Sequence, residues 1–426
     1  MNKGHMDEYK KILYLFLALI TLFFIKDTAG QGFFSNDRKN EKMKTADKNF
    51  KNGKYYRAYY TYKKLYKKDS NNAELNYKMG ATLMELKKNI EKAHNFLKKA
   101  KEKEEKGANY YLGRYYHLKE AFENAIKSYY RYLDNDNENI IPEHKVKRSI
   151  EISKRAKKMI KNSKDIAIHN IGETVNSRYS EYVPLISGDG SELYFTSRRK
   201  NSTGQKTDPN GNYFEDIYRA VKKEGKWQTP HKLRKGINTS THDATVALSQ
   251  SGNMLLIYRT NEEITGGDIL KCERTKENWS EPKKLGDFIN TKNQEASATM
   301  TLDEKTIYFS SNRKGGNGKK DIYKSKKLPN GKWSKAKNLE SKVNTSYEED
   351  GPFITGNNNT LYFSSNGHNT MGGYDIYKTT LKKNGEWSQP KNLGHPINTV
   401  KDDIYLTMTA DGNKAYYSSD KKGGYG

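Results

Sequence analysis

The sequence contains one cysteine, Cys272, among 426 residues. A single thiol cannot form an internal disulfide, and it excludes the Cys-x-x-Cys spacing of redox and zinc sites. Proline is also scarce, with nine residues in all, and none precedes Pro142. No G-x-S-x-G nucleophile elbow, H-E-x-x-H zinc motif or phosphate-binding glycine loop is present. From these absences we expect no metal, no cofactor, no catalytic residue and no enzymatic activity.

Apolar residues make up only 34% of the chain, but aromatic residues make up 12% and include 32 tyrosines. Tyrosine packs as an apolar side chain and keeps a hydrogen-bonding end, so it can supply part of a core. The net charge of +26 would suit nucleic-acid binding. The lysines are nevertheless spread over both halves and alternate with acids, as in residues 101–106. This pattern is typical of solvated surfaces, and we expect no nucleic-acid partner.

The N-terminus has the pattern of an export signal. Lys10 and Lys11 precede an apolar stretch over residues 12–25, which the small residues 28–30 follow. A basic flank, a short apolar core and small residues predict a secretory signal peptide over residues 1–30. An uncleaved anchor is the alternative, although this stretch is shorter than the roughly 20 residues of a membrane-spanning helix. We therefore expect the rest of the chain to lie outside the cytoplasm.

Residues 38–140 have the composition of helices and repeat with a period of about 34 residues. Small residues recur at Ala46, Gly80 and Gly113. Three alanines are each followed by a further core-type residue four and seven positions later, in the sets Ala58/Tyr62/Leu65, Ala93/Leu97/Ala100 and Ala125/Tyr129/Tyr132. Such spacing gives each helix one buried stripe, and small residues let helices approach closely. We expect packed helix pairs, with a plain helical bundle as the alternative.

Turn-forming residues separate the expected helices. Residues 69–72 and 134–137 are Asp, Ser and Asn only, and can end one helix and cap the next. Pro142 is suited to opening a further helix, expected over residues 143–160. Residues 141–165 are therefore interpreted as a capping helix and linker.

Residues 166–426 contain one unit written more than four times. An Asp-Ile-Tyr element, with Leu in place of Tyr in the second copy, recurs about every 52–54 residues, at Asp216, Asp268, Asp321 and Asp375. A tryptophan follows each copy, at Trp227, Trp279, Trp333 and Trp387. A repeat of this length, built from short strands and glycine turns, is typical of a β-propeller. The fifth copy stops before its Asp-Ile-Tyr, so we expect four complete blades, a truncated fifth and a fragment of a longer protein.

The third unit illustrates the expected blade. Strands are predicted at Thr306–Ser310 and Asp321–Ser325, where β-branched and aromatic residues gather between turns. Alternation along the first of these strands puts Ile307 and Phe309 on one face of the sheet and Tyr308 on the other.

Every unit also carries Asn followed by Ser or Thr, and then an acid. The acids are Glu181, Asp243, Glu295, Glu349 and Asp402. Catalytic groups break symmetry, because a reaction needs different roles from different residues. We interpret the recurring acids as partners of backbone N–H groups in equivalent turns.

Both halves resemble known repeats. Met79-Gly80-x-x-Leu83 and Leu112-Gly113-x-x-Tyr116 resemble the first-helix element of the tetratricopeptide repeat, although the Trp and Pro of its consensus are missing. The blade motif S-S-N-R/G-x(2,5)-G-G-x-D-I-Y resembles the WD-like repeats of TolB-type propellers. The order of the two modules resembles the N-terminal portion of exported OmpA-family proteins of Bacteroidota. Relatives of that family include a component of the type IX secretion and gliding machinery.

The resemblance implies an α + β multidomain chain with a tetratricopeptide-like α-solenoid over residues 38–140 and an incomplete β-propeller over residues 166–426. It implies a non-enzymatic periplasmic scaffold, associated with the outer membrane, that docks protein partners of the cell envelope. Peptidoglycan would be bound only through an OmpA-like domain that this sequence does not contain. An envelope glycan-binding or sensing propeller is the alternative. The partner, the total blade number and the choice among secretion, motility and wall maintenance stay open.

Candidate partner-binding residues come from two places. One is the inner face expected for the helical repeats, with Tyr77, Met84, Tyr110, Arg114 and His117, all of which could equally be core. The other is an insert in the first blade, residues 200–214, with Thr207, Asp208 and Asn210. Function tends to use loops that depart from a repeat. Deletion of residues 201–212 is therefore expected to remove partner capture without unfolding the propeller.

Overall fold

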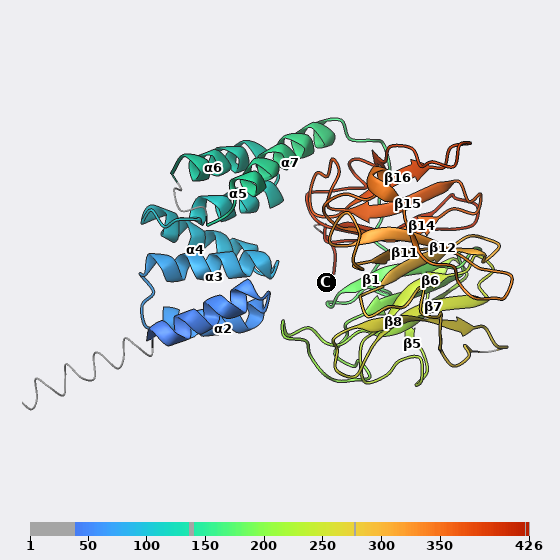
Figure 1. The fold of residues 1–426 in the computed structure, drawn as a ribbon. Helices are drawn as coiled ribbons and strands as arrows, with labels where there is room; N and C mark the ends of the chain where they lie inside the picture. Colours follow the sequence, from blue (N-terminus) through green and yellow to red (C-terminus); the bar gives the residue numbers. More distant parts are fainter. Residues whose placement is uncertain (1–38, 136–139, 277, 422, 426) are drawn as a thin grey trace, which may run out of the picture. The chain divides into compact units, whose positions relative to one another are not determined.

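The computed structural model describes residues 39–135, 140–276, 278–421 and 423–425. The predicted signal peptide, residues 1–30, lies outside these ranges. The chain divides into two compact units, residues 1–111 and 112–426, and each is described by itself. Figure 1 shows helices first along the chain and antiparallel strands after them.

The described part of the first unit is helical. Residues 39–51 form a helix, and the helices that follow are α2 (Tyr55–Tyr66), α3 (Ala73–Glu85), α4 (Ile90–Glu102) and the start of α5 (Ala108–Leu118). The predicted cap between α2 and α3 is confirmed, because the Asn72 side chain accepts the N–H of Leu75 at 2.9 Å. This bond satisfies one of the backbone donors that a helix start leaves open.

The predicted buried stripes are confirmed in both units. The first residues of the three sets, Ala58, Ala93 and Ala125, are 0% exposed, and the aromatic and aliphatic residues four positions later are at most 2% exposed. Gly80 explains how closely α3 and α4 approach: a Cβ at that position would lie 2.6 Å from Cγ of Leu97. Any larger residue there would push the two helices apart.

The second unit begins with the rest of α5, then α6 (Phe122–Asn135) and α7 (Glu143–Lys161). A Cβ at Gly113 would lie 2.5 Å from the Tyr129 ring, so the glycine gives α5 and α6 the same close approach. The expected helix over residues 143–160 is confirmed as α7, with Pro142 at its N-cap.

Five antiparallel sheets follow. The first contains β1 (Glu181–Ile186), β2 (Glu192–Ser197), β3 (Asp216–Lys223), β4 (Lys226–Trp227) and β5 (His231–Lys232); the second contains β6 (Asp243–Leu248), β7 (Met254–Thr260), β8 (Gly267–Glu273) and β9 (Lys283–Lys284). The third contains β10 (Ser297–Met300), β11 (Thr306–Ser311), β12 (Asp321–Lys326) and β13 (Lys337–Asn338), and a short helix, α8 (Glu340–Val343), comes after it. The fourth contains β14 (Glu349–Ile354), β15 (Thr360–Ser365), β16 (Asp375–Thr380) and β17 (Lys391–Asn392), and the fifth contains β18 (Asp403–Met408) and β19 (Ala415–Ser419).

The sheets are arranged as in a propeller. The first strand of each sheet contacts the first strand of the next, in the order β1, β6, β10, β14 and β18, and β18 also contacts β1. These five strands line a central cavity of about 40 Å³. Each sheet therefore packs face to face on its two neighbours, and their apolar side chains fill the space between them.

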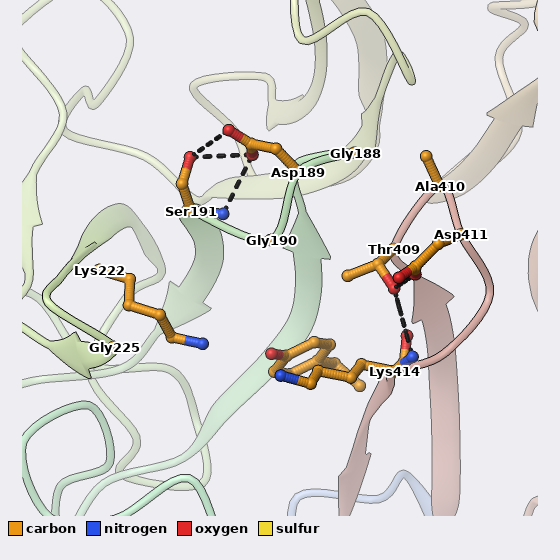
Figure 2. A pocket seen from close by; sticks show the side chains of 11 residues that line it. Gly188, Asp189, Gly190, Ser191, Lys222, Gly225, Thr409, Ala410, Asp411 and Lys414 are labelled. Carbon is orange, nitrogen blue, oxygen red and sulfur yellow. Dashed lines mark hydrogen bonds between the residues drawn. The ribbon is translucent and has the colours of Figure 1, made fainter.

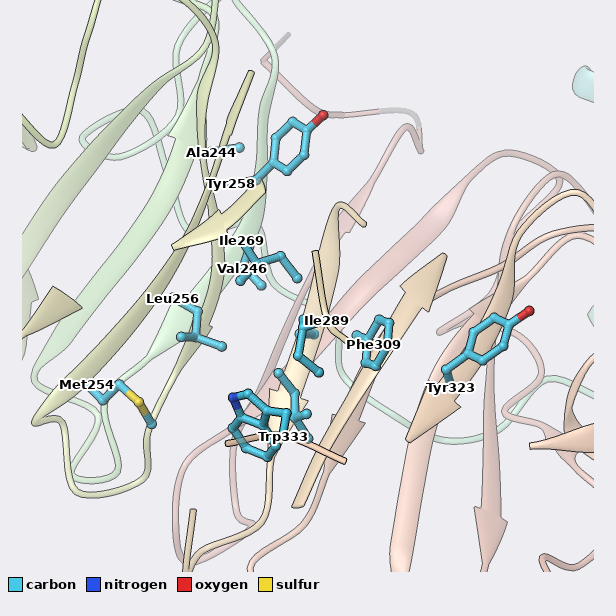
Figure 3. Packing of buried hydrophobic residues seen from close by; sticks show 12 residues of the cluster. Ala244, Val246, Met254, Leu256, Tyr258, Ile269, Ile289, Phe309, Tyr323 and Trp333 are labelled. Carbon is cyan, nitrogen blue, oxygen red and sulfur yellow. The ribbon is translucent and has the colours of Figure 1, made fainter. Parts of the chain in front are cut away.

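The packing confirms the predicted alternation of side chains between the two faces of the sheet along β11. Ile307 and Phe309 are 0% exposed and belong to the cluster between the second and third sheets, together with Leu256 and Trp333 (Figure 3). Tyr308 points to the other side and joins the cluster between the third and fourth sheets. There it packs edge-on against Trp387, with ring centroids 6.0 Å apart.

A buried asparagine in each connection between sheets binds the third strand of the sheet that the chain has just left. Its amide oxygen accepts an isoleucine N–H and its amide nitrogen donates to the C=O of the same isoleucine. The pairs are Asn238 with Ile217, Asn290 with Ile269, Asn344 with Ile322, and Asn398 with Ile376, at 2.7–2.9 Å. The isoleucine is the one in the Asp-Ile-Tyr element, which explains why both elements recur together.

The recurring acids bind backbone and hydroxyl groups in the same turns. Each accepts the N–H of the Ser or Thr four residues earlier, in the pairs Ser177/Glu181, Thr239/Asp243, Thr291/Glu295, Thr345/Glu349 and Thr399/Asp403. The predicted acid of the fifth unit, Asp402, is therefore wrong by one residue. Asp402 instead accepts the N–H of Tyr374 at 3.0 Å, because the spacing of four residues places Asp403 in the turn.

We predict that Asn344→Ala lowers the free energy of unfolding by about 2–4 kcal/mol. Asn344 is 1% exposed, so its loss leaves a buried N–H and a buried C=O of Ile322 without partners, each at about 1–3 kcal/mol. Asn384→Ala, which removes one hydrogen bond in an exposed turn, should change the free energy of unfolding by less than about 1 kcal/mol. Urea unfolding measures both, and equal effects would contradict the role given to the buried asparagine.

Two of the repeat aspartates have strongly raised pKa values. Burial raises the pKa of Asp375 to about 7, and burial raises that of Asp403 to about 6. Both carboxyl groups thus hold a proton in the folded chain at pH values where an unfolded aspartate, with a pKa of about 3.9, has lost it. Raising the pH through this window therefore favours unfolding.

We predict that Asp375 and Asp403 each lower the unfolding free energy as the pH rises from about 4 towards their own pKa values, by up to about 1.4 kcal/mol per pH unit, while His117, whose lowered pKa has the opposite effect, offsets part of this fall. Asp375→Asn should reduce this slope, because it removes the group with a pKa of about 7. Asp303→Asn is the control, since hydrogen bonding from Thr301 lowers the pKa of Asp303 and its titration lies below the window. An unchanged slope in Asp375→Asn, measured by urea unfolding across this pH range, would refute the assignment.

Candidate functional site

The first sheet carries the insert that the sequence singled out, between β2 and β3. Its backbone forms a small hairpin, with Thr207 bridged to Tyr213. The Asp208 side chain holds the turn by accepting the N–H groups of Asn210 and Asn212 at 2.8 and 3.0 Å. A carboxylate that accepts local N–H bonds in this way fixes the conformation of a short loop.

Arg198 fastens this insert to the sheet. Its guanidinium donates to Asp208 at 3.0 Å and to Glu215 at 2.6 Å, and also to the Tyr182 hydroxyl at 3.0 Å. Arg198 follows β2, Glu215 precedes β3 and Tyr182 lies in β1, so one side chain joins the insert to three strand ends. Planar guanidinium groups suit such multiple contacts better than a lysine does.

His242 closes the network from the second sheet. Its Nδ1 lies 2.8 Å from a Glu215 oxygen, and its ring stacks on Phe214 of the insert with centroids 4.0 Å apart. Burial alone would raise the pKa of Glu215, but the bond from His242 and the charge of Arg198 outweigh it and lower the pKa to about 2. Glu215 is therefore ionised at neutral pH. Burial and the Glu215 charge raise the pKa of Tyr182 well above its usual value, so Tyr182 is a neutral phenol.

A second polar group comes from the third and fourth sheets. Lys320 lies 2.7 Å from Asp350, which also accepts from Ser310 at 2.7 Å. Tyr374 donates to Glu348 at 2.7 Å. Burial favours the neutral form of Asp350, but the Lys320 charge outweighs it and the pKa of Asp350 is lowered. This carboxylate is therefore ionised as well.

Tyr405, from β18, lies between the two polar groups. Its pKa is raised well above the usual value by burial and by the negative charges of Asp350 and Glu215. Its backbone has a φ of 63°, and Val183 and Gly351 take similar values, 49° and 55°, in β1 and β14. A valine in this region is strained, and such strain is found mostly where the surroundings enforce it, often at functional sites.

We call these residues the central polar network: Tyr182, Arg198, Asp208, Glu215, His242, Lys320, Glu348, Asp350, Tyr374 and Tyr405. Its carboxylates outnumber its permanent cations, Arg198 and Lys320, by four to two. The surplus is negative in a chain whose net charge is +26. A surface of this kind attracts positively charged groups of a ligand or partner.

Neither a metal site nor a membrane span emerges from the residues that the structure describes. Within those ranges, no group of three or more His, Cys, Asp or Glu residues is arranged to hold a metal ion. Across the same ranges, every helix is too short or too polar to cross a bilayer.

The structure places the predicted helical residues in different surroundings. Met84, Tyr77 and His117 are 1%, 7% and 8% exposed, so they are core side chains, the alternative that the sequence left open. His117 faces Ser153 at 2.9 Å, and burial lowers its pKa to about 4. Tyr110 and Arg114 are partly exposed, and their role in partner binding stays a prediction.

The predicted insert residues differ in exposure and in structural role. Thr207 is exposed and Asn210 is partly exposed, whereas Asp208 is an anchor for the loop. Deletion of residues 201–212 would also remove Thr203, whose N–H and hydroxyl bind buried Asp216 at 2.7 and 2.9 Å. Lys232, 3.6 Å away, would then be the remaining charged partner of Asp216. We therefore expect this deletion to destabilise the propeller, contrary to the expectation from the sequence, because a buried carboxylate that loses its hydrogen bonds is costly.

The sequence interpretation missed most of the central polar network. A signal was present: the residue after the recurring acid has four identities in five units, being Tyr182, Ala244, Ala296, Asp350 and Ile404 once the fifth acid is placed at 403. The residue before the Asp-Ile-Tyr element varies similarly, as Glu215, Gly267, Lys320 and Tyr374. Positions that vary inside a regular repeat are the ones free to take individual roles.

No protein-family model and no curated protein matches the chain. Solved structures do resemble it. A putative TolB from Agrobacterium tumefaciens is 17% identical with a TM-score of 0.37, over 57% of this chain and 72% of the other. An alpha-L-arabinofuranosidase from Lactobacillus brevis is 13% identical with a TM-score of 0.38, over 59% and 88%. A puromycin hydrolase is 12% identical with a TM-score of 0.32, over 57% and 36%.

These neighbours include TolB-type propellers, in agreement with the predicted resemblance of the blade repeats to that type. They also correct the expectation that the chain is not an enzyme. The similar structures include an arabinofuranosidase and a puromycin hydrolase, which are enzymes. The expectation, which rested on the absence of catalytic motifs, is therefore wrong, and we do not retain it.

We predict that Arg198→Ala lowers the unfolding free energy by roughly 2–3 kcal/mol, since it leaves Glu215 and Asp208 without their shared cation in a partly buried site. The insert should also become sensitive to protease, because its anchor is lost. Arg178→Ala, at an exposed arginine, is the control. Urea unfolding and mapping of the first cleavage by mass spectrometry measure the two effects. First cleavage elsewhere than residues 200–214 would contradict the anchoring role.

Proposed function

We propose that this protein is a docking scaffold that binds partner proteins through the insert-bearing end of its propeller. The observation that carries the proposal is the break in the repeat. The first sheet alone of the four with a described Asp-Ile-Tyr strand has a long insert before that strand, and Arg198 holds this insert in one conformation. Loops positioned by a rigid scaffold are the usual carriers of recognition.

The insert has the properties of a preorganised recognition loop. Its tip is exposed at Thr207, Pro209 and Gly211, while its base is fixed by Asp208 and by the stack of Phe214 on His242. A loop that is already ordered loses little conformational freedom on binding, which favours affinity. The negative surplus of the central polar network favours a partner that presents basic side chains.

The cellular setting of the proposal comes from the resemblance of the sequence. Export by the predicted signal peptide would place the scaffold in the periplasm, and the likeness to OmpA-family proteins supports association with the outer membrane. Helical repeats and propeller would then each dock an envelope protein. Two binding modules on one chain raise the effective concentration of one partner near the other, which is how a scaffold promotes assembly without contacting every component.

Site-specific photo-crosslinking tests the proposal without deleting the loop. A photoreactive amino acid at Thr207, in the full chain and in cells that produce it, should give one discrete protein adduct. Unlabelled chain in excess should reduce the adduct, because the site is saturable. A membrane-impermeant quencher of the crosslinker then reports whether the adduct forms outside the cytoplasm.

The matched control places the same amino acid at Asn330, an exposed turn position in the third sheet. We expect little or no adduct there, since that turn belongs to the repeat. Equal adducts from both positions would indicate non-specific contact. Absence of any adduct at Thr207, with a chain that is folded by circular dichroism, would refute docking through the insert.

A further inference from the structure

A polar pocket of about 580 Å³ lies where the fifth sheet meets the first. The turn between β1 and β2, the end of β3 and the turn between β18 and β19 form its walls (Figure 2). The two turns are joined by a bond from the N–H of Ala410 to the C=O of Gly188 at 3.0 Å. The volume is in the range that small-molecule sites occupy, roughly 300–1,000 Å³.

Two lysines and two aspartates line this pocket, but they are used differently. The Asp189 carboxylate accepts from Ser187 and Ser191 at 2.6–3.0 Å. The Asp411 carboxylate accepts from Thr409 and Asn413 at 2.5–3.0 Å. Both carboxylates are thus occupied within their own turns, and this bonding lowers the pKa of each.

The ammonium groups of Lys222 and Lys414 point into the space between these turns (Figure 2). Within the described residues, neither ammonium lies within 4.0 Å of a carboxylate, although Lys222 lies 4.7 Å from the centre of the Trp227 ring. The pocket therefore contains two positive charges whose only nearby acids are already engaged. Positive charges that line one pocket without a carboxylate partner favour an anionic ligand.

The repeat shows how unusual this pair is. Arg274, like Lys222, lies six residues after the Asp of its Asp-Ile element. Glu192 lies one residue before Leu193, which pairs with the last residue of β1, and Lys414 lies one residue before Ala415, which pairs with the last residue of β18. At the junction of the first and second sheets these positions form an ion pair, with Arg274 2.8 Å from Glu192. At the junction of the fifth and first sheets the same two positions hold two lysines.

The packing of aromatic side chains between the fifth and first sheets is also incomplete. Elsewhere a buried tryptophan closes the gap between sheets, as Trp279 does against Tyr194 with centroids 5.8 Å apart. The equivalent residues here, Trp227 and Tyr416, are only partly buried, and Tyr416 lines the pocket. An exposed aromatic face beside hydrogen-bonding groups is a common platform for the apolar face of a sugar ring.

We propose that this pocket binds an acidic sugar, with the ligand's carboxylate between Lys222 and Lys414 and its ring against Tyr416. The two lysines select an acidic ligand, because the ligand's carboxylate takes the place that the Glu192 carboxylate has in the Arg274–Glu192 ion pair. The hydroxyl of Ser191 and the backbone of the two turns supply partners for sugar hydroxyls. This site is separate from the insert and does not rest on the docking function.

The test uses the full chain and three probes: glucuronate, glucose and inorganic phosphate. Isothermal titration calorimetry at low salt should show saturable binding of glucuronate, weaker binding of phosphate and none of glucose at the same concentrations. Higher salt should weaken glucuronate binding, since an ion contact is screened. Glucose binding as tight as that of glucuronate, or no glucuronate binding, would overturn the proposal. Phosphate binding as tight as that of glucuronate would overturn the assignment to a sugar.

Lys414→Glu is the decisive variant. It recreates the acid–base pair found at the next junction, so the new carboxylate should take the place of the ligand. We expect glucuronate affinity to fall about tenfold or more, the loss of one charge-assisted contact, and the thermal midpoint of the unliganded chain to rise. Lys327→Ala is the matched control, because Lys327 occupies the Lys222 position in the third sheet and should leave binding unchanged. Retained glucuronate binding in a folded Lys414→Glu chain would refute the proposal.

Discussion

The propeller depends on one backbone interaction, the two hydrogen bonds between a buried asparagine side chain and the main chain of an isoleucine. Each connection between sheets runs from the short outer strand of one sheet to the innermost strand of the next. Asn238, Asn290, Asn344 and Asn398 fix that path by satisfying an N–H and a C=O of the third strand of the sheet that the chain leaves. The following Thr and acid then set the start of the next inner strand. Unpaired groups in these buried turns would be costly.

Because these contacts are the same in every unit, they leave other positions free to differ. At the positions just after the repeat acid and just before the Asp-Ile-Tyr element, Tyr182, Glu215, Lys320 and Asp350 belong to an asymmetric charged group. The insert and the Lys222/Lys414 junction are two further departures. Regular contacts thus maintain the fold, and the irregular positions provide the surfaces that distinguish this protein from its own repeat.

The sequence was sufficient for the broad architecture because periodicity is a local property. The unit length, the strand alternation at Ile307, Tyr308 and Phe309, and the alanine stripes of the helices all follow from spacing. Whether Met84 or His117 lies in a groove or in the core does not, since that depends on which helix packs next to it. The sequence marks some positions of the central polar network by their variation within the repeat, but it does not give their contacts or the role of Asp208 as an anchor, because Arg198, Asp208 and Tyr182 meet only after the sheet has formed.

The central claim is that partner recognition resides in the insert and the charged centre, and not in the repeated turns. Hydrogen exchange of the full chain, alone and bound to the partner that crosslinks at the insert, measures this most directly. The account predicts slower exchange on binding in residues 200–214 and in the inner strands at Tyr182 and Tyr405, with the outer turns at residues 329–332 and 383–386 unchanged. Protection confined to those outer turns, with exchange in the insert unaltered, would contradict it.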